Sequence, residues 1–159
     1  MYRIRRATEQ DARQIHVVRN SAIRAVCRQS YSQEVIDRWT DGDEPSAAFV
    51  TVVGECFYVI ECQGEVVASG AVDLSTGKLD AIFVAPEHMR RGCAATMLEF
   101  LEQLAYQAGL ARLHLESTLN AVGFYMRQGY VKVREAKYQS PRGFELDCAV
   151  MEKRLMSTE

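Results

Sequence analysis

The segment from Ile82 to Ala95 has the residue types that bind a phosphate through the main chain: Ile-Phe-Val-Ala-Pro-Glu-His-Met-Arg-Arg-Gly-Cys-Ala-Ala. An apolar strand runs into a proline turn, and the following Arg-Arg-Gly-Cys-Ala stretch opens a helix. Backbone N–H groups at a helix start lack an intrahelical partner and lie at the positive end of the helix dipole, so they favour a phosphate or pyrophosphate. Gly92 has no Cβ, which lets a ligand approach the backbone closely. The plainer alternative is an ordinary turn in which Arg90 and Arg91 are solvated surface charges.

A second segment, Asn120 to Tyr130, reads Asn-Ala-Val-Gly-Phe-Tyr-Met-Arg-Gln-Gly-Tyr. It predicts a short helix with a Phe-Tyr pair that ends at a glycine before an aromatic strand start. A positioned phenol such as that of Tyr125 can give a proton to a leaving group. A lone helix tyrosine more often packs its ring on the core and keeps its hydroxyl at the surface.

Both segments resemble the motifs of the GNAT superfamily, the acetyl-CoA-dependent N-acetyltransferases. The first motif is Gln/Arg-x-x-Gly-x-Gly/Ala after a strand ending in Val-x-Pro, and the second is Asn-x-x-x-Phe-Tyr-x-x-x-Gly-Phe/Tyr. The first motif falls on Met89, Arg90, Arg91, Gly92, Cys93 and Ala94. Met89 replaces the usual Gln or Arg, which removes a side-chain donor but keeps the backbone donor. The motifs occur in the expected order, and the resemblance covers most of the chain.

The resemblance implies a role for each matching residue. Backbone amides from Met89 to Ala95 are expected to hold the pyrophosphate of acetyl-CoA, and backbone groups of Phe83 and Val84 to align its pantetheine. Asn120 matches a residue that holds the pantetheine or pyrophosphate arm. Tyr125 matches a tyrosine near the CoA sulfur, where it would protonate the departing thiolate.

The acceptor amine arrives protonated, with a lysine-like pKa of about 10.4, so a base or a water must take its proton. Glu116 is one candidate, at the C-terminal end of the strand beside the cofactor. Asp80 is the other, on the strand that delivers Val84, and superfamily members often carry a carboxylate on the matching face. Either residue could equally be a solvated strand-end carboxylate.

The cysteines and histidines predict neither a disulfide framework nor a metal site. Five cysteines without a Cys-x-x-Cys pair, and three histidines on different expected elements, lack the spacing of metal ligands. Cys93 lies at a helix start, a setting that lowers a thiol pKa. Without an assignable base partner it is interpreted as a small loop residue open to oxidation.

Composition predicts one globular domain over residues 1–159. Hydrophobic residues make up 48% and charged residues 25% of the chain. A net charge of −2 gives no basic field for nucleic acid or an anionic membrane. Residues 1–6 lack the apolar core of a signal peptide and no apolar run is long enough for a bilayer, so a cytoplasmic location is expected.

Hydrophobic periodicity and turn residues predict alternating strands and helices. Strands are expected over residues 2–6, 57–61, 66–72, 79–84, 111–116, 130–138 and 145–153. Helices are expected after a capping box at Thr8 and Asp11, after the N-cap Ser32, from Pro45 through Val53, and over 93–107 and 119–127. The second to fourth strands form an antiparallel meander, and the strand–helix–strand unit around residues 93–107 is a parallel crossover.

These features predict a mixed α/β (α+β) domain with the GNAT fold. Its central, mostly antiparallel sheet is expected to be flanked by helices and splayed in the middle, so that acetyl-CoA wedges between the strands ending at Val84 and Glu116. The expected reaction is direct attack of a primary amine on the thioester in a ternary complex, without a metal. A catalytically silent acyl-CoA-binding regulatory module is the alternative.

The N-terminal part, with Tyr31, Ser32 and Trp39, resembles a subgroup of small stand-alone bacterial acetyltransferases whose first two helices border the acceptor site. The following Asp41, Asp43 and Glu44 would suit a cationic amine, although a solvated loop is the simpler interpretation. The acceptor is a small-molecule amine or a protein amine, and the sequence leaves this choice and the acyl length open. A homodimer through the C-terminal strands is a further option.

Overall fold

The computed structural model describes residues 1–155, and at Ala81 it describes the main chain alone. Seven strands form one sheet in the order β1-β2-β3-β4-β5-β7-β6. Their bounds are β1 (Tyr2–Arg6), β2 (Phe57–Cys62), β3 (Glu65–Asp73), β4 (Lys78–Val84), β5 (Arg112–Thr118), β6 (Val131–Gln139) and β7 (Glu145–Arg154). Neighbouring strands are antiparallel except β4 and β5, which are parallel. The predicted mixed α/β class with a mostly antiparallel sheet is confirmed.

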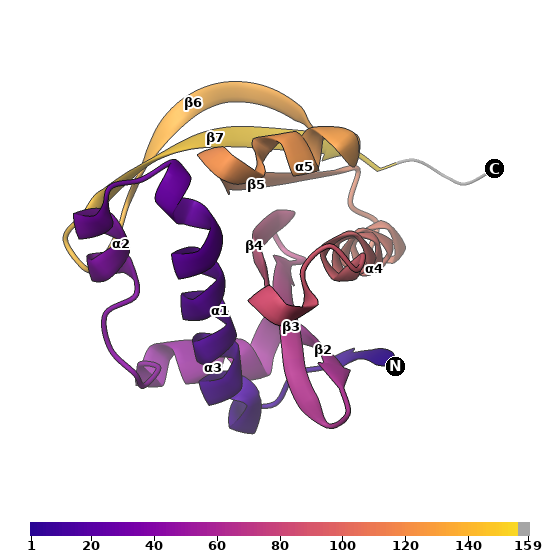
Figure 1. The fold of residues 1–159 in the computed structure, drawn as a ribbon. Helices are drawn as coiled ribbons and strands as arrows, with labels where there is room; N and C mark the ends of the chain where they lie inside the picture. The colour runs from indigo at the N-terminus through magenta and orange to yellow at the C-terminus, as the bar shows by residue number, and fades with distance from the viewer. Residues whose placement is uncertain (156–159) are drawn as a thin grey trace.

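The helices cover both faces of the sheet. They are α1 (Ala12–Val26), α2 (Gln33–Trp39), α3 (Ala47–Cys56), α4 (Cys93–Gln107) and α5 (Val122–Arg127). Figure 1 shows α1, α2 and α3 together on one side and α4 on the other. Local sequence sets where two of them begin, because Ser32 Oγ accepts the Val35 N–H at 3.2 Å and Ser46 Oγ accepts the Phe49 N–H at 3.1 Å.

The core lies between α4 and the sheet on one face and between α1 and the sheet on the other. The buried apolar stripe of α4, with Met97 and Leu101, packs in one cluster with residues of β3, β4 and β5. Ile15 of α1 packs in a second cluster with residues of β2 and β3. A Cβ added at Gly70 would come within 2.9 Å of Met97 Cγ, so α4 lies directly on the backbone of β3.

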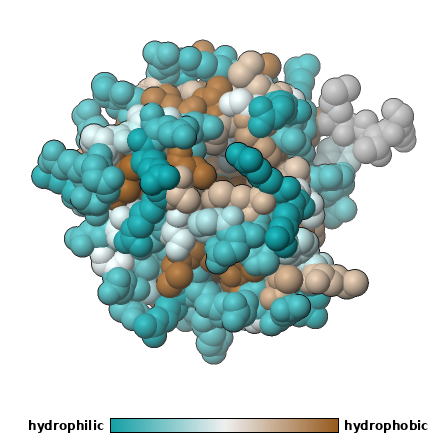
Figure 2. All heavy atoms as spheres, viewed as in Figure 1, coloured by the Kyte–Doolittle hydropathy of each residue, from teal (hydrophilic) through white to brown (hydrophobic). Residues whose placement is uncertain are grey.

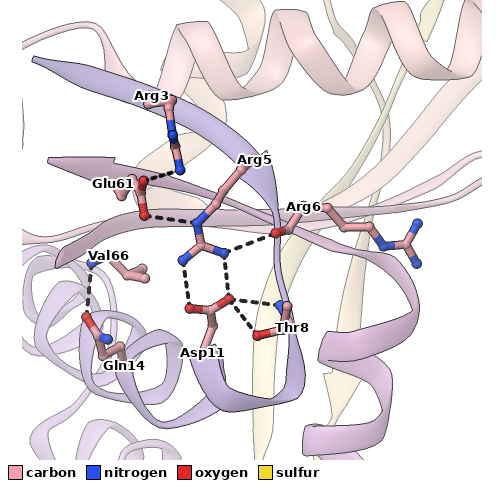
Figure 3. A network of polar contacts seen from close by, with 8 residues as sticks. All are labelled: Arg3, Arg5, Arg6, Thr8, Asp11, Gln14, Glu61 and Val66. Atoms are coloured by element: carbon pink, nitrogen blue, oxygen red, sulfur yellow. Dashed lines mark hydrogen bonds and ion pairs between the residues drawn. The ribbon is translucent and has the colours of Figure 1, made fainter. Parts of the chain in front are cut away.

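A polar network fastens the start of α1 to β1 and β2 (Figure 3). Arg5 donates to both carboxylate oxygens of Asp11, at 2.8 and 2.9 Å, and its Nε donates to Glu61 at 2.9 Å. Asp11 also accepts the Thr8 backbone N–H at 2.8 Å, and the predicted capping box forms. Arg3 makes a second ion pair with Glu61 at 2.7 Å.

The predicted connections are confirmed. β2, β3 and β4 form the antiparallel meander, and β4, α4 and β5 form the parallel crossover. The helix expected from Leu119 instead begins as a 3₁₀ turn, and α5 starts at Val122. β7 lies between β5 and β6, an order that the sequence does not specify. Within residues 1–155, no helix combines the length and apolar character needed to cross a membrane.

Candidate active site

The sheet opens between β4 and β5. Their only paired residues within the described chain are Lys78 and His114, at the beginning of both strands. β3 continues along the outer edge of β4 to Val84, and β7 continues along the outer edge of β5 to Thr118. The facing edges of β4 and β5 therefore separate, and Figure 1 shows them apart. The predicted splay in the middle of the sheet is confirmed.

The loop after β4 presents backbone donors at this opening. Arg90 and Gly92 have positive φ angles of 62° and 84°, and α4 begins at Cys93. The first hydrogen bond of the helix joins the Thr96 N–H to the Gly92 oxygen at 2.9 Å. Within residues 1–155, no acceptor takes a hydrogen bond from the backbone N–H groups of residues 90–95. Arg90, Arg91 and Gly92 are exposed, so the loop fits an anion of the size of a diphosphate.

Two residues of this loop differ from the expectation. The backbone N–H of Met89 donates to the Pro86 oxygen at 3.3 Å, so it is not among the free donors. The side chain of Cys93 points into the core, where it is 4% exposed. Burial raises the pKa of its thiol, although the side chain of Tyr2 offsets part of the rise. The expectation of a lowered thiol pKa is wrong because the helix start lies over the core.

Tyr125 lies under the opening. It is 6% exposed, and its ring packs edge-on against Phe124 and Tyr130, with centroid distances of 5.1 and 5.7 Å. Burial raises the pKa of Tyr125 to about 12, and a hydrogen bond from the backbone amide of Ile82 offsets part of that rise. Since Ile82 lies on β4 beyond the point where β5 separates, the phenol oxygen lies at the opening.

A cavity of about 440 Å³ lies on the face of the sheet that α1, α2 and α3 cover. Its polar lining includes Lys78, Asp80 and Glu116, and aromatic and aliphatic side chains make up much of the rest: Ile15, Tyr31, Trp39, Phe49, Val52, Phe57, Phe83, Tyr138 and Leu146. Figure 2 shows a further hollow, on the face viewed, between the surfaces over α1 and α4, with apolar side chains in its wall.

A β-bulge brings Asp80 to the same cavity as Phe83. Residues three apart point to opposite faces of a regular strand. Here Ala71 pairs with Asp80 while Ser69 pairs with Phe83, so β4 carries one more residue than β3 over this stretch. Both side chains consequently line the cavity.

The two candidate carboxylates differ in their surroundings. Glu116 accepts from Lys78 Nζ at 3.1 Å and lies 3.9 Å from the thiol of Cys148. Asp80 has no ion-pair partner within 4.0 Å among the described residues, and its exposed surface faces the cavity. Burial in that concave wall raises the pKa of Asp80, Lys78 lowers it, and Asp73 and Glu116 raise it further.

Other expected site residues lie outside the cavity. Asn120 is exposed in the 3₁₀ turn that follows β5. The acidic side chains after Trp39 do not line the cavity, and Glu44 pairs with Arg13 at 3.1 Å. Sequence reasoning missed Lys78, although its alternation with Asp80 on one strand face was a usable signal. It also missed Arg19 and Tyr138, for which no local signal exists. Among the described residues, no group of three potential ligands could hold a metal ion.

Comparison with known proteins identifies a matching family and several solved structures with a similar fold. Residues 27–145 match the family described as Acetyltransferase (GNAT) domain. A GCN5-related N-acetyltransferase structure from Rhodopseudomonas palustris, described as "aminotransferase, class-II", has a TM-score of 0.90 at 23% identity, covering 96% of this chain and 95% of that one.

Two further structures share the fold at lower identity. PaiA N-acetyltransferase from Thermoplasma acidophilum, in complex with coenzyme A, has a TM-score of 0.75 at 16% identity, covering 97% and 99% of the two chains. The ribosomal-protein-S18-alanine N-acetyltransferase from Escherichia coli has a TM-score of 0.72 at 18% identity, covering 100% and 97%. A comparison with curated proteins gives no match. The family match over residues 27–145, together with this shared fold, shows that the chain belongs to the GNAT acetyltransferase family and is an N-acetyltransferase.

Proposed function

We propose that this enzyme transfers the acetyl group of acetyl-CoA to a primary amine by direct attack in a ternary complex. The observation that carries the proposal is the opening between β4 and β5, which has free backbone donors at one side and a carboxylate-lined cavity at the other. Family membership supports acetyl transfer, and the fold neighbour PaiA from Thermoplasma acidophilum is in complex with coenzyme A.

The chain offers groups that match each part of the cosubstrate. The free N–H groups of residues 90–95 and the exposed side chains of Arg90 and Arg91 would hold the diphosphate. The unpaired edge of β4, at Phe83 and Val84, would hydrogen-bond the amides of the pantetheine arm, and Asn120 would contact the same arm. Acetyl-CoA supplies an acyl group already activated as a thioester.

Asp80 is the better of the two candidate bases. An acceptor ammonium must lose a proton before its nitrogen can attack the thioester carbonyl. Glu116 is engaged by Lys78, whereas Asp80 faces the cavity with a raised pKa, which strengthens it as a base. Asp80 would take the proton directly or through a water, and Glu116 and Lys78 would orient the amine.

Tyr125 would complete the proton balance. Attack forms the C–N bond, and collapse of the tetrahedral adduct breaks the C–S bond and releases a thiolate. A phenol with a pKa near 12 stays protonated at neutral pH, so Tyr125 can give its proton to that sulfur. The attacking nitrogen loses its second proton through solvent and Tyr125 regains one from solvent, while Asp80 releases the proton it took to bulk water, so each turnover gives the amide, the free thiol and one proton.

The test is an acceptor screen that follows free-thiol release at constant acetyl-CoA, with calorimetry of coenzyme A binding alongside. The panel contains small amines, polyamines, amino acids and peptides with free N-termini, because the fold neighbour from Escherichia coli is named for a ribosomal-protein alanine. Turnover with any amine supports the proposal. Tight coenzyme A binding without turnover over the whole panel indicates a silent binding module, and no binding at millimolar coenzyme A refutes the site.

A further inference from the structure

Two arginines meet at one end of the acceptor cavity. Arg19, from α1, lines the cavity, whereas Arg142, in the turn between β6 and β7, is exposed beside it and is not itself a lining residue. The Nη1 atoms of both donate to the same carbonyl oxygen, that of Trp39, each at 3.2 Å. Their guanidinium groups are therefore close neighbours, although 123 positions separate them in the sequence.

Neither charge is neutralised by the protein. Within residues 1–155, no carboxylate lies within 4.0 Å of Arg19 or Arg142, whereas Arg3 and Arg13 each have one and Arg5 has two. Burial and the charge of Arg142 lower the pKa of Arg19 to about 10. Two positive charges that are close together and partly removed from water repel each other, which costs free energy unless an anion binds between them.

Both arginines donate to the carbonyl oxygen of Trp39 at the C-terminal end of α2, but this capping of the helix explains only part of the arrangement. Arg19 bonds Asn20 and Trp39 through Nη1, and Arg142 bonds the Trp39 and Asp41 carbonyls through Nη1. A guanidinium carries five N–H donors in a planar fork. Within the described chain, the Nε and Nη2 groups of both side chains have no acceptor, so most of each fork remains available to a ligand.

Arg24 is an arginine of the same helix that also donates to a carbonyl oxygen at the end of α2. It lies one and a half turns along α1 from Arg19 and donates to the Thr40 oxygen at 3.1 Å. It does not line the cavity. Capping at the end of α2 therefore does not require an arginine in the cavity wall.

The rest of the cavity defines the ligand that fits. Asp80 and Glu116 supply negative charge on the β4 and β5 wall, and the intervening surface is apolar and aromatic, with Phe49, Phe57 and Leu146 among its residues. We propose that the acceptor amine also carries a carboxylate, which Arg19 and Arg142 bind while the carboxylates of β4 and β5 receive the ammonium. The substrate class is thus amino acids and related aminocarboxylates, an inference that rests on the proposed acetyl transfer for its catalytic meaning.

The test compares matched ligands with and without the carboxylate: phenylalanine against phenylalaninamide, and 6-aminohexanoate against hexylamine. Trp39 is the single tryptophan and lines the cavity, so its fluorescence reports binding without turnover. In the wild type, at least one carboxylate ligand should bind about tenfold or more tightly than its partner without the carboxylate, as expected for a charge-assisted hydrogen bond. Thiol release should show the same preference in KM.

Arg19→Met should abolish this preference by weakening the carboxylate ligand alone, and Arg19→Lys should restore part of it. Arg142→Met changes an exposed turn and should reduce the preference in the same direction, which keeps the test valid if the α1 variants fold poorly. Arg24→Met is the matched control, because it removes a capping arginine from the same helix and should leave the preference unchanged.

The outcomes separate the two proposals. Equal or tighter binding of the ligands without a carboxylate in the wild type, or an equal loss for both ligands in Arg19→Met, overturns the carboxylate site. If amines without a carboxylate are also the best substrates, acetyl transfer stands and the aminocarboxylate class falls. If the fluorescence preference depends on Arg19 but no amine is acetylated, the anion site stands and the proposed reaction falls.

Discussion

At Tyr125 the proposed chemistry depends on one hydroxyl group at the opening of the sheet. Tyr125→Phe should lower kcat about 100-fold at neutral pH, because a positioned acid commonly contributes that much. Coenzyme A affinity should stay unchanged, since the ring remains packed on Phe124 and Tyr130. Steady-state kinetics across the pH range and calorimetry measure the two effects separately.

Tyr130→Phe is the control for this prediction. Tyr130 is another buried phenol, 5.7 Å from Tyr125 between ring centroids, but its hydroxyl donates to Glu102 at 2.8 Å, away from the opening. The kcat of Tyr130→Phe should therefore match that of the wild type. An unchanged kcat in Tyr125→Phe would remove Tyr125 from the role of acid.

At Asp80 the pKa predicts the pH dependence of catalysis. A base works only when it is deprotonated, so kcat/KM should rise with pH through a pKa above the ordinary aspartate range. In Asp80→Asn this rise of kcat/KM with pH should be absent, and kcat/KM near pH 7 should fall about 100-fold. The deficit should shrink as pH approaches the amine pKa of about 10.4, because free amine then needs no base.

Thermal unfolding distinguishes this loss from misfolding. The folded-state pKa of Asp80 is raised, so its ionised form is disfavoured in the folded protein and costs stability above that pKa. Asp80→Asn should therefore have an unchanged or higher Tm at neutral pH. A retained rising limb in this variant would assign the base role to Glu116.

The element that matters most for coenzyme A is the turn into α4. Gly92→Ala places a Cβ at a positive φ of 84°, which costs about 1–2 kcal/mol, and that Cβ meets no protein atom within 4 Å. It would instead occupy the space in front of the free N–H groups. The dissociation constant for coenzyme A should rise about tenfold or more by calorimetry.

Gly109→Ala provides the same strain at the other end of α4. Gly109 has a φ of 88° and open space around its Cβ position. Both variants should lose similar stability in urea, but only Gly92→Ala should bind coenzyme A more weakly. Equal affinities in the two variants would show that the backbone around Gly92 does not contact the ligand.

At the same scale, local sequence predicted the elements well because their signals are local. The apolar stripe of α4 and the caps at Ser32 and Ser46 depend on residues within one or two turns. The strand–helix–strand order predicts that β4 and β5 are parallel, whereas the opening between them was expected only from the resemblance to the GNAT motifs.

Features that depend on distant contacts could not be predicted. The bulge in β4 exists only relative to β3, and it alone brings Asp80 and Phe83 to one cavity. The pairing of Arg142 with Arg19 depends on a turn between β6 and β7 that reaches α2 across the sheet. Cys93 was placed correctly at a helix start, but its burial depends on how α4 seats on the core.

For the whole molecule, the position of α1 over the sheet depends on the network of Arg5, Asp11 and Glu61. α1 supplies Arg19 and Ile15 to the cavity, and the network fixes its first turn to β1 and β2. Hydrogen bonds from Arg5 hold the pKa values of Asp11 and Glu61 below their usual ranges. Asp11 is the better buried of the two, with 9% of its side chain exposed.

Asp11→Asn should lower the free energy of unfolding by about 2 kcal/mol at pH 7, as expected for a buried charge-assisted pair. A lowered folded-state pKa contributes stability that is present above the unfolded value of about 3.9 and is lost as pH falls through the folded value. The difference between wild type and variant should therefore shrink in acid. Urea unfolding at several pH values measures it. Glu135→Gln, which removes an exposed pair with Lys132, should change little at any pH. A pH-independent difference for Asp11→Asn would mean that the Asp11 charge is not what holds α1 in place.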